Sequence, residues 1–308
     1  MLREKFLKDP SYSDKKPNES RNSYAKRTCL FLTKKLTSKY ENLDLIVWPE
    51  SAVGFFYNKE SKDSFVQEIQ KIIKNNNIHM YVNNYDSDIE KTEEGLKRHI
   101  YNNSDLISPP DGEVIGSYRK IFLLAFGEYN PFKNTIIEDL FPDIIDMMDK
   151  SSMGNATPGS EIKELSFLKN NKKITFTPQI CYEIIIPSFT RKFTKKNSEL
   201  IINATNDRWF GVTKASKQHL LLGATRAIEN RMYLVRTTNS GISTVVSPTG
   251  QYLPFISKNG NNTKFTALYE KDYMVTTIKP LTIDTFYKKY GDVFAWIISI
   301  IAIISIIY

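Results

Sequence analysis

Short apolar runs recur along this chain, and they alternate with segments whose apolar residues return every three or four positions. The run at 43–48 reads LDLIVW, whereas 20–40 has the helical spacing from Ala25 to Tyr40. A continuous apolar run is typical of a strand buried on both faces, and the wider spacing is typical of a helix packed on one side. Strands that alternate with helices predict an α/β fold.

The same patterns locate the other elements. Cys29 lies on the apolar stripe of the first predicted helix, which indicates a small packed residue and not a reactive thiol. Strands are predicted at 43–48, 78–83, 99–107, 113–121, 173–180, 200–204, 232–238 and 242–247, and helices at 20–40, 61–75, 184–194 and 214–230.

The N-terminal part is basic and polar. Residues 1–20 hold two prolines and no apolar stretch, so we predict a basic flexible leader that is not a secretory signal. Residues 1–40 carry eleven Lys and Arg against four Asp and Glu, which accounts for seven of the net charge of +8. The remainder is almost balanced and holds no nucleic-acid-binding motif, so no nucleic-acid partner is predicted.

The C-terminal part is apolar. The last sixteen residues, 293–308, contain no charge and eight isoleucines. A helix of that length spans about 24 Å, against roughly 30 Å for the hydrocarbon layer, and extending it back to 286 adds aromatic side chains. A buried strand or core helix is the alternative, but a terminal run is difficult to enclose in a core. We therefore predict a C-terminal transmembrane helix at 286–308, after a folded domain at 21–285.

Cysteine and histidine are too sparse and scattered for a metal centre. Cys29 and Cys181 lie 152 positions apart, and no two of the three histidines stand three to five residues apart. Neither a disulfide framework nor a zinc site is expected. No Gly-rich phosphate loop occurs, so we expect no metal and no nucleotide cofactor.

Two predicted strands lead to charged residues that could take part in catalysis. The run at 43–48 meets Pro49, which cannot continue a central ladder, and Glu50 follows at once. Lys120 closes the strand at 113–121, and Glu128 follows eight residues later, after an apolar stretch. Taken singly, each has a structural alternative: a helix-capping or solvated carboxylate, or a surface lysine.

A third candidate, Cys181, stands where a predicted strand gives way to a helix. A helix N-terminus lowers the pKa of a thiol and offers backbone N–H groups to an anion, although an inert packed cysteine is the structural alternative. Together the three segments supply the groups that a cysteine-dependent acyl transfer needs. Cys181 would be the nucleophile and Glu50 the base that takes its proton. Lys120 and backbone N–H groups near Tyr182 would stabilise the tetrahedral intermediate.

The order Glu, Lys, Cys resembles that of the nitrilase, or carbon–nitrogen hydrolase, superfamily. The residues around these three resemble the motifs of its apolipoprotein N-acyltransferase branch. The likeness runs from about residue 43 to the C-terminal apolar segment. It rests on WPES at 48–51, YNNS at 101–104, Lys120 with FGEY at 126–129, CYE at 181–183, NATNDRWFG at 203–211, QH at 218–219, ATRAIENR at 224–231 and TNSGIS at 238–243.

The resemblance implies a nitrilase-like αββα sandwich as the catalytic domain at 21–285. The catalytic cysteine would take an acyl chain from a membrane phospholipid as a thioester. It would then pass the chain to the N-terminal cysteine amine of a diacylglyceryl-modified lipoprotein. The implied site consists of the nucleophile Cys181, the base Glu50, the oxyanion-stabilising Lys120, the supporting carboxylates Glu128 and Glu183, and the site-lining Tyr182.

The resemblance also implies partners and a location. The partners are a phospholipid acyl donor and a diacylated lipoprotein acceptor, at the bacterial inner membrane, with the catalytic domain facing the periplasm. The N-terminal membrane helices of that branch are not found in these residues, so a separately encoded membrane-helix portion is a further expected partner. Two alternatives remain, namely an amidase with water as the acceptor, and an inactive remnant or membrane-bound interaction module.

Overall fold

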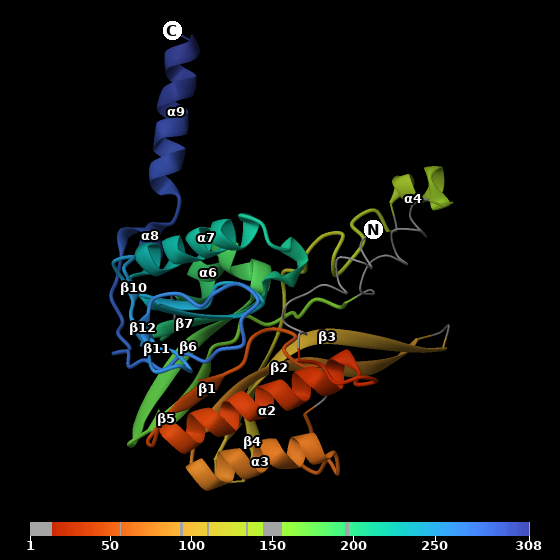
Figure 1. Ribbon diagram of the computed structural model, residues 1–308. Helices are drawn as coiled ribbons and strands as arrows, with labels where there is room; N and C mark the ends of the chain where they lie inside the picture. The colour runs from red at the N-terminus through yellow and green to blue at the C-terminus, as the bar shows by residue number, and fades with distance from the viewer. Residues whose placement is uncertain are drawn as a thin grey trace.

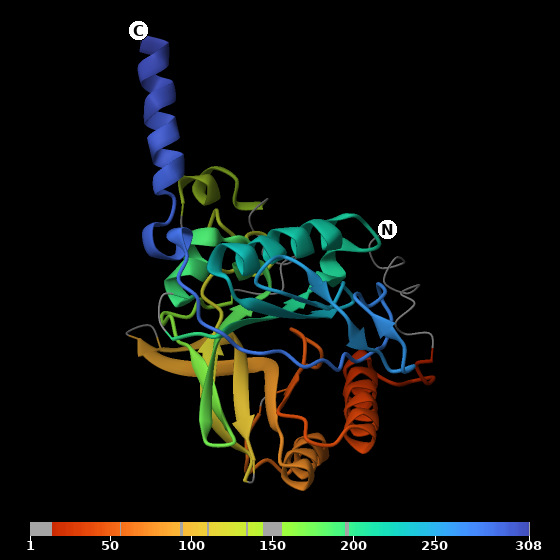
Figure 2. The same cartoon turned by 90° about the vertical axis from the view of Figure 1, so that its left-hand side faces the viewer.

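Two β-sheets lie face to face, and helices cover the outer face of each, as Figures 1 and 2 show. The computed structural model describes residues 14–55, 57–92, 95–109, 111–133, 135–143, 156–194 and 197–307. Its four layers are those of the predicted αββα sandwich. Most of the predicted leader, residues 1–13, lies outside the described residues, as does Tyr308.

The first sheet has the strand order β1-β2-β3-β4. β1 runs parallel to β2, and the other neighbours are antiparallel. β2 and β3 are longer than predicted because their outer halves form an exposed hairpin without an apolar run to mark it. The strands are β1 (Leu45–Val47), β2 (His79–Thr92), β3 (Gly95–Ser108) and β4 (Glu113–Arg119).

The second sheet has the order β10-β9-β8-β7-β6-β5, and β6, β7 and β8 run parallel. The short strands β5 and β10 were not predicted, and neither was a small sheet of β11 (Phe255–Ile256) and β12 (Asn262–Thr263). The six strands are β5 (Leu165–Lys169), β6 (Lys172–Ile180), β7 (Leu200–Asn206), β8 (Tyr233–Asn239), β9 (Thr244–Val246) and β10 (Tyr252–Leu253).

Helices α2 (Arg21–Lys39) and α3 (Ser64–Asn76) cover the first sheet, while α6 (Pro187–Thr194) and α7 (Ala215–Asn230) cover the second. The predicted helix at 184–194 is divided. A 3₁₀ helix, η2 (Cys181–Ile185), precedes α6, which starts anew at Pro187 because proline suits a first helical position and not an interior one. A second such turn, η3 (Asp207–Phe210), follows β7.

The apolar runs of the central strands are explained by alternate packing. On β2, Met80 and Val82 belong to the core beneath α2 and α3, while Tyr81 belongs to the core between the sheets. On β7, Ile201 packs in the core with α7, and Ile202 faces the first sheet. Since both faces of these strands are covered, neither face carries a regular polar pattern.

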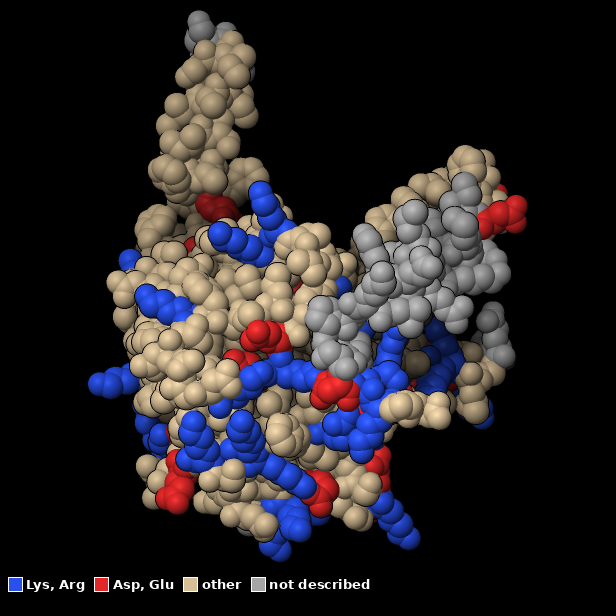
Figure 3. Space-filling view, in the orientation of Figure 1, with Lys and Arg blue, Asp and Glu red and all other residues tan. Residues whose placement is uncertain are grey.

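The prediction of one continuous helix at 286–308 is wrong. The chain forms α8 (Phe286–Tyr290), turns at Gly291 with a φ of 71°, and continues as α9 (Val293–Ile307). The fifteen residues of α9 span about 22 Å, short of the roughly 30 Å hydrocarbon layer. Among the described residues, no helix combines the length and apolarity needed to cross a membrane. α9 projects from the body, and Figure 3 shows no charged side chain along it.

Candidate active site

The ends of β1, β4 and β6 meet between the two sheets, and each is followed by one candidate residue. Glu50 comes three residues after β1, Lys120 comes directly after β4, and Cys181 comes directly after β6. These three and Glu128 line one cavity of about 110 Å³. The fold thus brings four of the six predicted residues together.

Lys120 lies between the two carboxylates. Its Nζ donates to Glu50 Oε1 at 3.1 Å and to Glu128 Oε1 at 2.8 Å, and the lysine is only 1% exposed. Burial by itself lowers the pKa of Lys120, but the charges of Glu50, Cys181 and Glu128 outweigh it and raise the pKa overall. The side chain is therefore an ammonium group, held in the cavity lining between two carboxyl groups.

Two asparagines that sequence analysis left without a role support these carboxylates: Asn102 contacts both, and Asn83 holds Asn102. Asn102 Nδ2 donates to Glu50 Oε1 at 2.7 Å and to Glu128 Oε1 at 3.3 Å. Asn83 Nδ2 donates to Asn102 Oδ1 at 2.7 Å, and Asn83 Oδ1 accepts from the Ser51 N–H at 2.8 Å. A buried amide is costly unless it is paired. The sequence does contain a signal for this role. Two adjacent asparagines, 83–84 and 102–103, fall at the end of one predicted strand and inside another.

Three residues beside the reactive groups have left-handed backbone conformations. The φ angles are 51° at Ser51, 63° at Phe126 and 52° at Cys181. None of the three is glycine, so each conformation persists only because the surrounding structure holds it. At Cys181 this turn ends β6 and starts η2, with the side chain in the cavity lining.

The thiol of Cys181 is neutral at ordinary pH. Burial first and the charge of Glu50 second raise its pKa, the charge of Lys120 lowers it, and the result is about 12. A neutral thiol needs a base to become a nucleophile. Glu50 lines the same cavity and has a carboxylate that can take the proton.

Glu183 lies behind the cavity and is fully buried. Its Oε1 accepts from the Tyr118 hydroxyl at 2.8 Å and from the Ile121 N–H at 2.7 Å, and its Oε2 accepts from the Ile180 N–H at 2.7 Å. Burial raises the pKa of Glu183 to about 7, although these donors lower it. This carboxyl group therefore ties the segment around Lys120 to the end of β6.

Tyr182, the last predicted residue, is not among the residues that line the cavity, and it is 37% exposed. Its backbone belongs to the first turn of η2, where N–H groups have no carbonyl partner within the helix. In the described ranges, no group of three His, Cys, Asp or Glu side chains could hold a metal ion.

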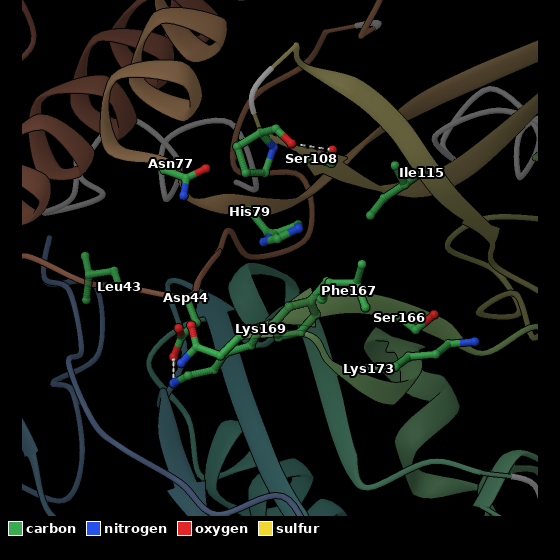
Figure 4. A pocket seen from close by; sticks show the side chains of 13 residues that line it. Leu43, Asp44, Asn77, His79, Ser108, Ile115, Ser166, Phe167, Lys169 and Lys173 are labelled. Carbon is green, nitrogen blue, oxygen red and sulfur yellow. Dashed lines mark hydrogen bonds and ion pairs between the residues drawn. The ribbon is translucent and has the colours of Figure 1, made fainter.

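A larger hollow of about 470 Å³ lies at the opposite end of the sandwich, beside the start of β1 and the turn from β5 to β6 (Figure 4). There Lys169 pairs with Asp44, and the ring of His79 lies 5.1 Å from that of Phe167. None of the six predicted site residues lines this hollow. The candidate active site is therefore the smaller of these two cavities.

The Carbon-nitrogen hydrolase family model matches residues 22–273. The chain belongs to the carbon-nitrogen hydrolase family. Within this family it is similar to proteins named apolipoprotein N-acyltransferase. It is 33% identical over 253 residues to one from Geobacter metallireducens, covering 82% of this chain and 43% of the relative.

A second relative within the carbon-nitrogen hydrolases, apolipoprotein N-acyltransferase 2 of Leptospira interrogans, is 30% identical over 296 residues. The match covers 82% of this chain and 48% of the relative. The chain thus spans about half the length of the curated relatives it matches. Among solved structures, Nit3 of Saccharomyces cerevisiae, of the nitrilase superfamily, has a similar fold, with a TM-score of 0.52 at 17% identity over 77% of this chain and 80% of that chain.

Proposed function

We propose that this carbon-nitrogen hydrolase chain is the acyl-transferring part of an apolipoprotein N-acyltransferase. One observation carries the proposal: Glu50, Lys120 and Cys181 line one cavity, and Lys120 is held between Glu50 and Glu128. The names of the curated relatives support the choice of a lipoprotein as acceptor.

In the first half of the reaction, Glu50 accepts the thiol proton while the Cys181 sulfur attacks the ester carbonyl of a phospholipid. The ammonium group of Lys120 and the N–H groups of the first turn of η2 stabilise the tetrahedral oxyanion. The bond from the carbonyl carbon to the glycerol oxygen then breaks, and that oxygen takes the proton from Glu50. A lysophospholipid leaves, and the acyl chain remains on Cys181 as a thioester.

In the second half, the α-amine of a diacylglyceryl-modified cysteine attacks the thioester carbonyl. The amine loses a proton to Glu50, the carbon–sulfur bond breaks as the amide forms, and the sulfur regains that proton. Glu128 and Glu183 contribute through position, since the former contacts Lys120 and the latter ties the two strand ends together.

Exposed apolar side chains support lipid substrates and contact with a bacterial membrane surface. Trp209 lines the cavity and is 52% exposed. Helices α4 (Ile136–Leu140) and α9 project from the side of the molecule that α7 covers, as Figures 1 and 2 show. Ile136 is 73% exposed and Leu140 is 64% exposed. Side chains of this kind favour insertion among acyl chains over contact with water.

The acceptor decides between this function and amide hydrolysis. The chain is incubated with phospholipid vesicles of one acyl composition, and a diacylated lipopeptide with a free N-terminal amine is then added. We expect mass spectrometry to find the acyl mass on the Cys181 peptide and then on the lipopeptide. Release of the chain as free fatty acid, with the lipopeptide unchanged, would indicate a hydrolase, and no adduct at all would contradict an acyl-enzyme.

A further inference from the structure

A closed ring of buried polar side chains lies beneath the Cys181 turn, and the mechanism above does not use it. The Cys181 carbonyl oxygen accepts from Asn203 Nδ2 at 3.3 Å and lies 3.4 Å from His219 Nε2. His219 Nδ1 lies 2.8 Å from Asp207 Oδ1. Arg236 closes the ring, because it donates to Asp207 Oδ2 at 3.0 Å and to Asn203 Oδ1 at 2.6 Å.

The ring joins two strands of the second sheet, the 3₁₀ helix η3 and the covering helix α7 to the turn. Asn203 comes from β7, Asp207 from η3, His219 from α7 and Arg236 from β8, and each is at most 6% exposed. A loop also packs closely against it, since a Cβ added to Gly241 would lie 2.4 Å from Asp207 Oδ2. Because these buried polar groups are hydrogen-bonded to one another, the side chains of the ring have few other conformations available.

We propose that this ring is a positioning device that holds the carbonyl group of Cys181. By holding it, the ring maintains the left-handed turn that presents the thiol to the cavity. The inference rests on the proposal that Cys181 is the nucleophile. A non-glycine residue with a φ of 52° persists only where its surroundings restrain it, and the carbonyl is the group of this turn that the ring contacts.

Asn203 is the constant part of the device. Its Nδ2 also donates to the Gln179 carbonyl at 3.1 Å, so one amide group holds the backbone on both sides of Ile180. Its Oδ1 faces Arg236, which fixes the amide so that the nitrogen, and not the oxygen, points to the turn. This contact does not depend on pH.

His219 is the variable part, because both of its nitrogens face acceptors. Burial raises the pKa of Asp207, but the hydrogen bond from His219 and the charge of Arg236 outweigh it, so Asp207 is ionised. Burial, followed by the charge of Arg236, lowers the pKa of His219. A neutral imidazole donates to one acceptor and an imidazolium to both, so the bond to the Cys181 carbonyl strengthens as the pH falls.

The test measures how fast Cys181 is alkylated by iodoacetamide, followed by mass spectrometry of its peptide in the folded chain. Asn203→Asp keeps the oxygen that faces Arg236 but places an acceptor against the Cys181 carbonyl. Because a misplacement of about 1 Å can cost on the order of 10²-fold, we expect alkylation about 10²-fold slower. Acyl-enzyme formation should slow in parallel.

Asn230→Asp is the matched control. Asn230 is as fully buried, its Nδ2 donates to the Arg226 carbonyl at 2.9 Å, and its Oδ1 accepts from Thr194 at 2.6 Å. Since neither of these hydrogen bonds reaches the Cys181 turn, we expect Cys181 to react within a few-fold of the natural rate. If Cys181 were alkylated equally slowly in both variants, the ring would contribute only to the stability of the fold, and the proposal would be overturned.

A pair of uncharged variants covers the case in which Asn203→Asp fails to fold or acts through its charge. His219→Gln offers an N–H donor to the Cys181 carbonyl, as the imidazolium form of His219 does, whereas His219→Leu offers none. We expect the Leu variant to be alkylated at least several-fold more slowly than the Gln variant, and equal rates would contradict the proposal. Alkylation needs no lipid substrate, so a protein that fails to transfer acyl chains but shows these differences would refute the proposed function and leave the positioning device intact.

Discussion

Cys29 and Cys181 are both poorly accessible thiols, and burial raises the pKa of each to about 12. Their surroundings differ. Cys29 lies on α2 in an apolar core with Leu32 and Leu36, and burial accounts for its shift. Around Cys181 the charge of Glu50 raises the pKa together with burial, whereas the charge of Lys120 lowers it. Burial alone accounts for the pKa shift of Cys29, whereas charged groups also act on Cys181, and we therefore predict that only Cys181 reacts.

The largest expected effect comes from removing the thiol that has charged neighbours. Cys181→Ala should abolish the acyl adduct, because no other atom in the cavity can form the thioester. The measurement is mass spectrometry of the intact chain after incubation with phospholipid. If the acyl adduct still forms in this variant, the nucleophile is a residue other than Cys181, and the two cysteines do not differ in reactivity.

A second variant removes the cation that distinguishes the Cys181 cavity. Lys120→Met leaves Glu50 buried without its ion pair, so we expect the free energy of unfolding to fall by about 3–5 kcal/mol. Acyl-enzyme formation should fall by about 10²–10³, because an oxyanion donor is lost.

The control for this variant is Lys169→Met, which breaks the exposed pair with Asp44 at the far end of the sandwich. It should cost less than about 1 kcal/mol. Urea unfolding of both variants gives the comparison, and equal losses would argue against a special role for the buried pair.

A third prediction concerns pH. The folded-state pKa of Glu183, about 7, lies above its ordinary value of 4.5. Between those values the folded state binds more protons than the unfolded state, so the free energy of unfolding falls as the pH rises from 4.5 to 7. Glu183→Gln cannot titrate and should lack this part of the slope. Unfolding at several pH values tests it, and identical slopes in the two chains would show that Glu183 does not titrate there.

The smallest effect is expected from the other cysteine. Cys29→Ala should leave acyl transfer within a few-fold and cost about 1 kcal/mol of stability, as for a small packed residue. The same acyl-adduct assay measures it. A loss comparable to that of Cys181→Ala, in a chain that still folds, would mean that the two thiols are not as different as their surroundings indicate.

Local patterns in the sequence were sufficient for much of the fold. The spacing from Ala25 to Tyr40 predicted α2, and the run at 43–48 predicted β1, because each depends on neighbours a few positions apart. The C-terminal helix was predicted as one piece since its apolar run is continuous in composition. That run begins only at 293, and Gly291, with its positive φ, separates α8 from α9 just before it.

Sequence by itself determined which residue types follow the strands, and this was enough to select Glu50, Lys120 and Cys181 as candidates. Their catalytic roles stay predictions. Tertiary structure decided their surroundings: that Lys120 contacts a carboxylate 70 positions away, that Asn102 orients both carboxylates, and that a ring of polar groups lies beneath the turn. Strand periodicity is a property of adjacent residues, whereas these contacts exist only after two sheets have closed on each other. Their energy depends on burial, which no short stretch of chain produces alone.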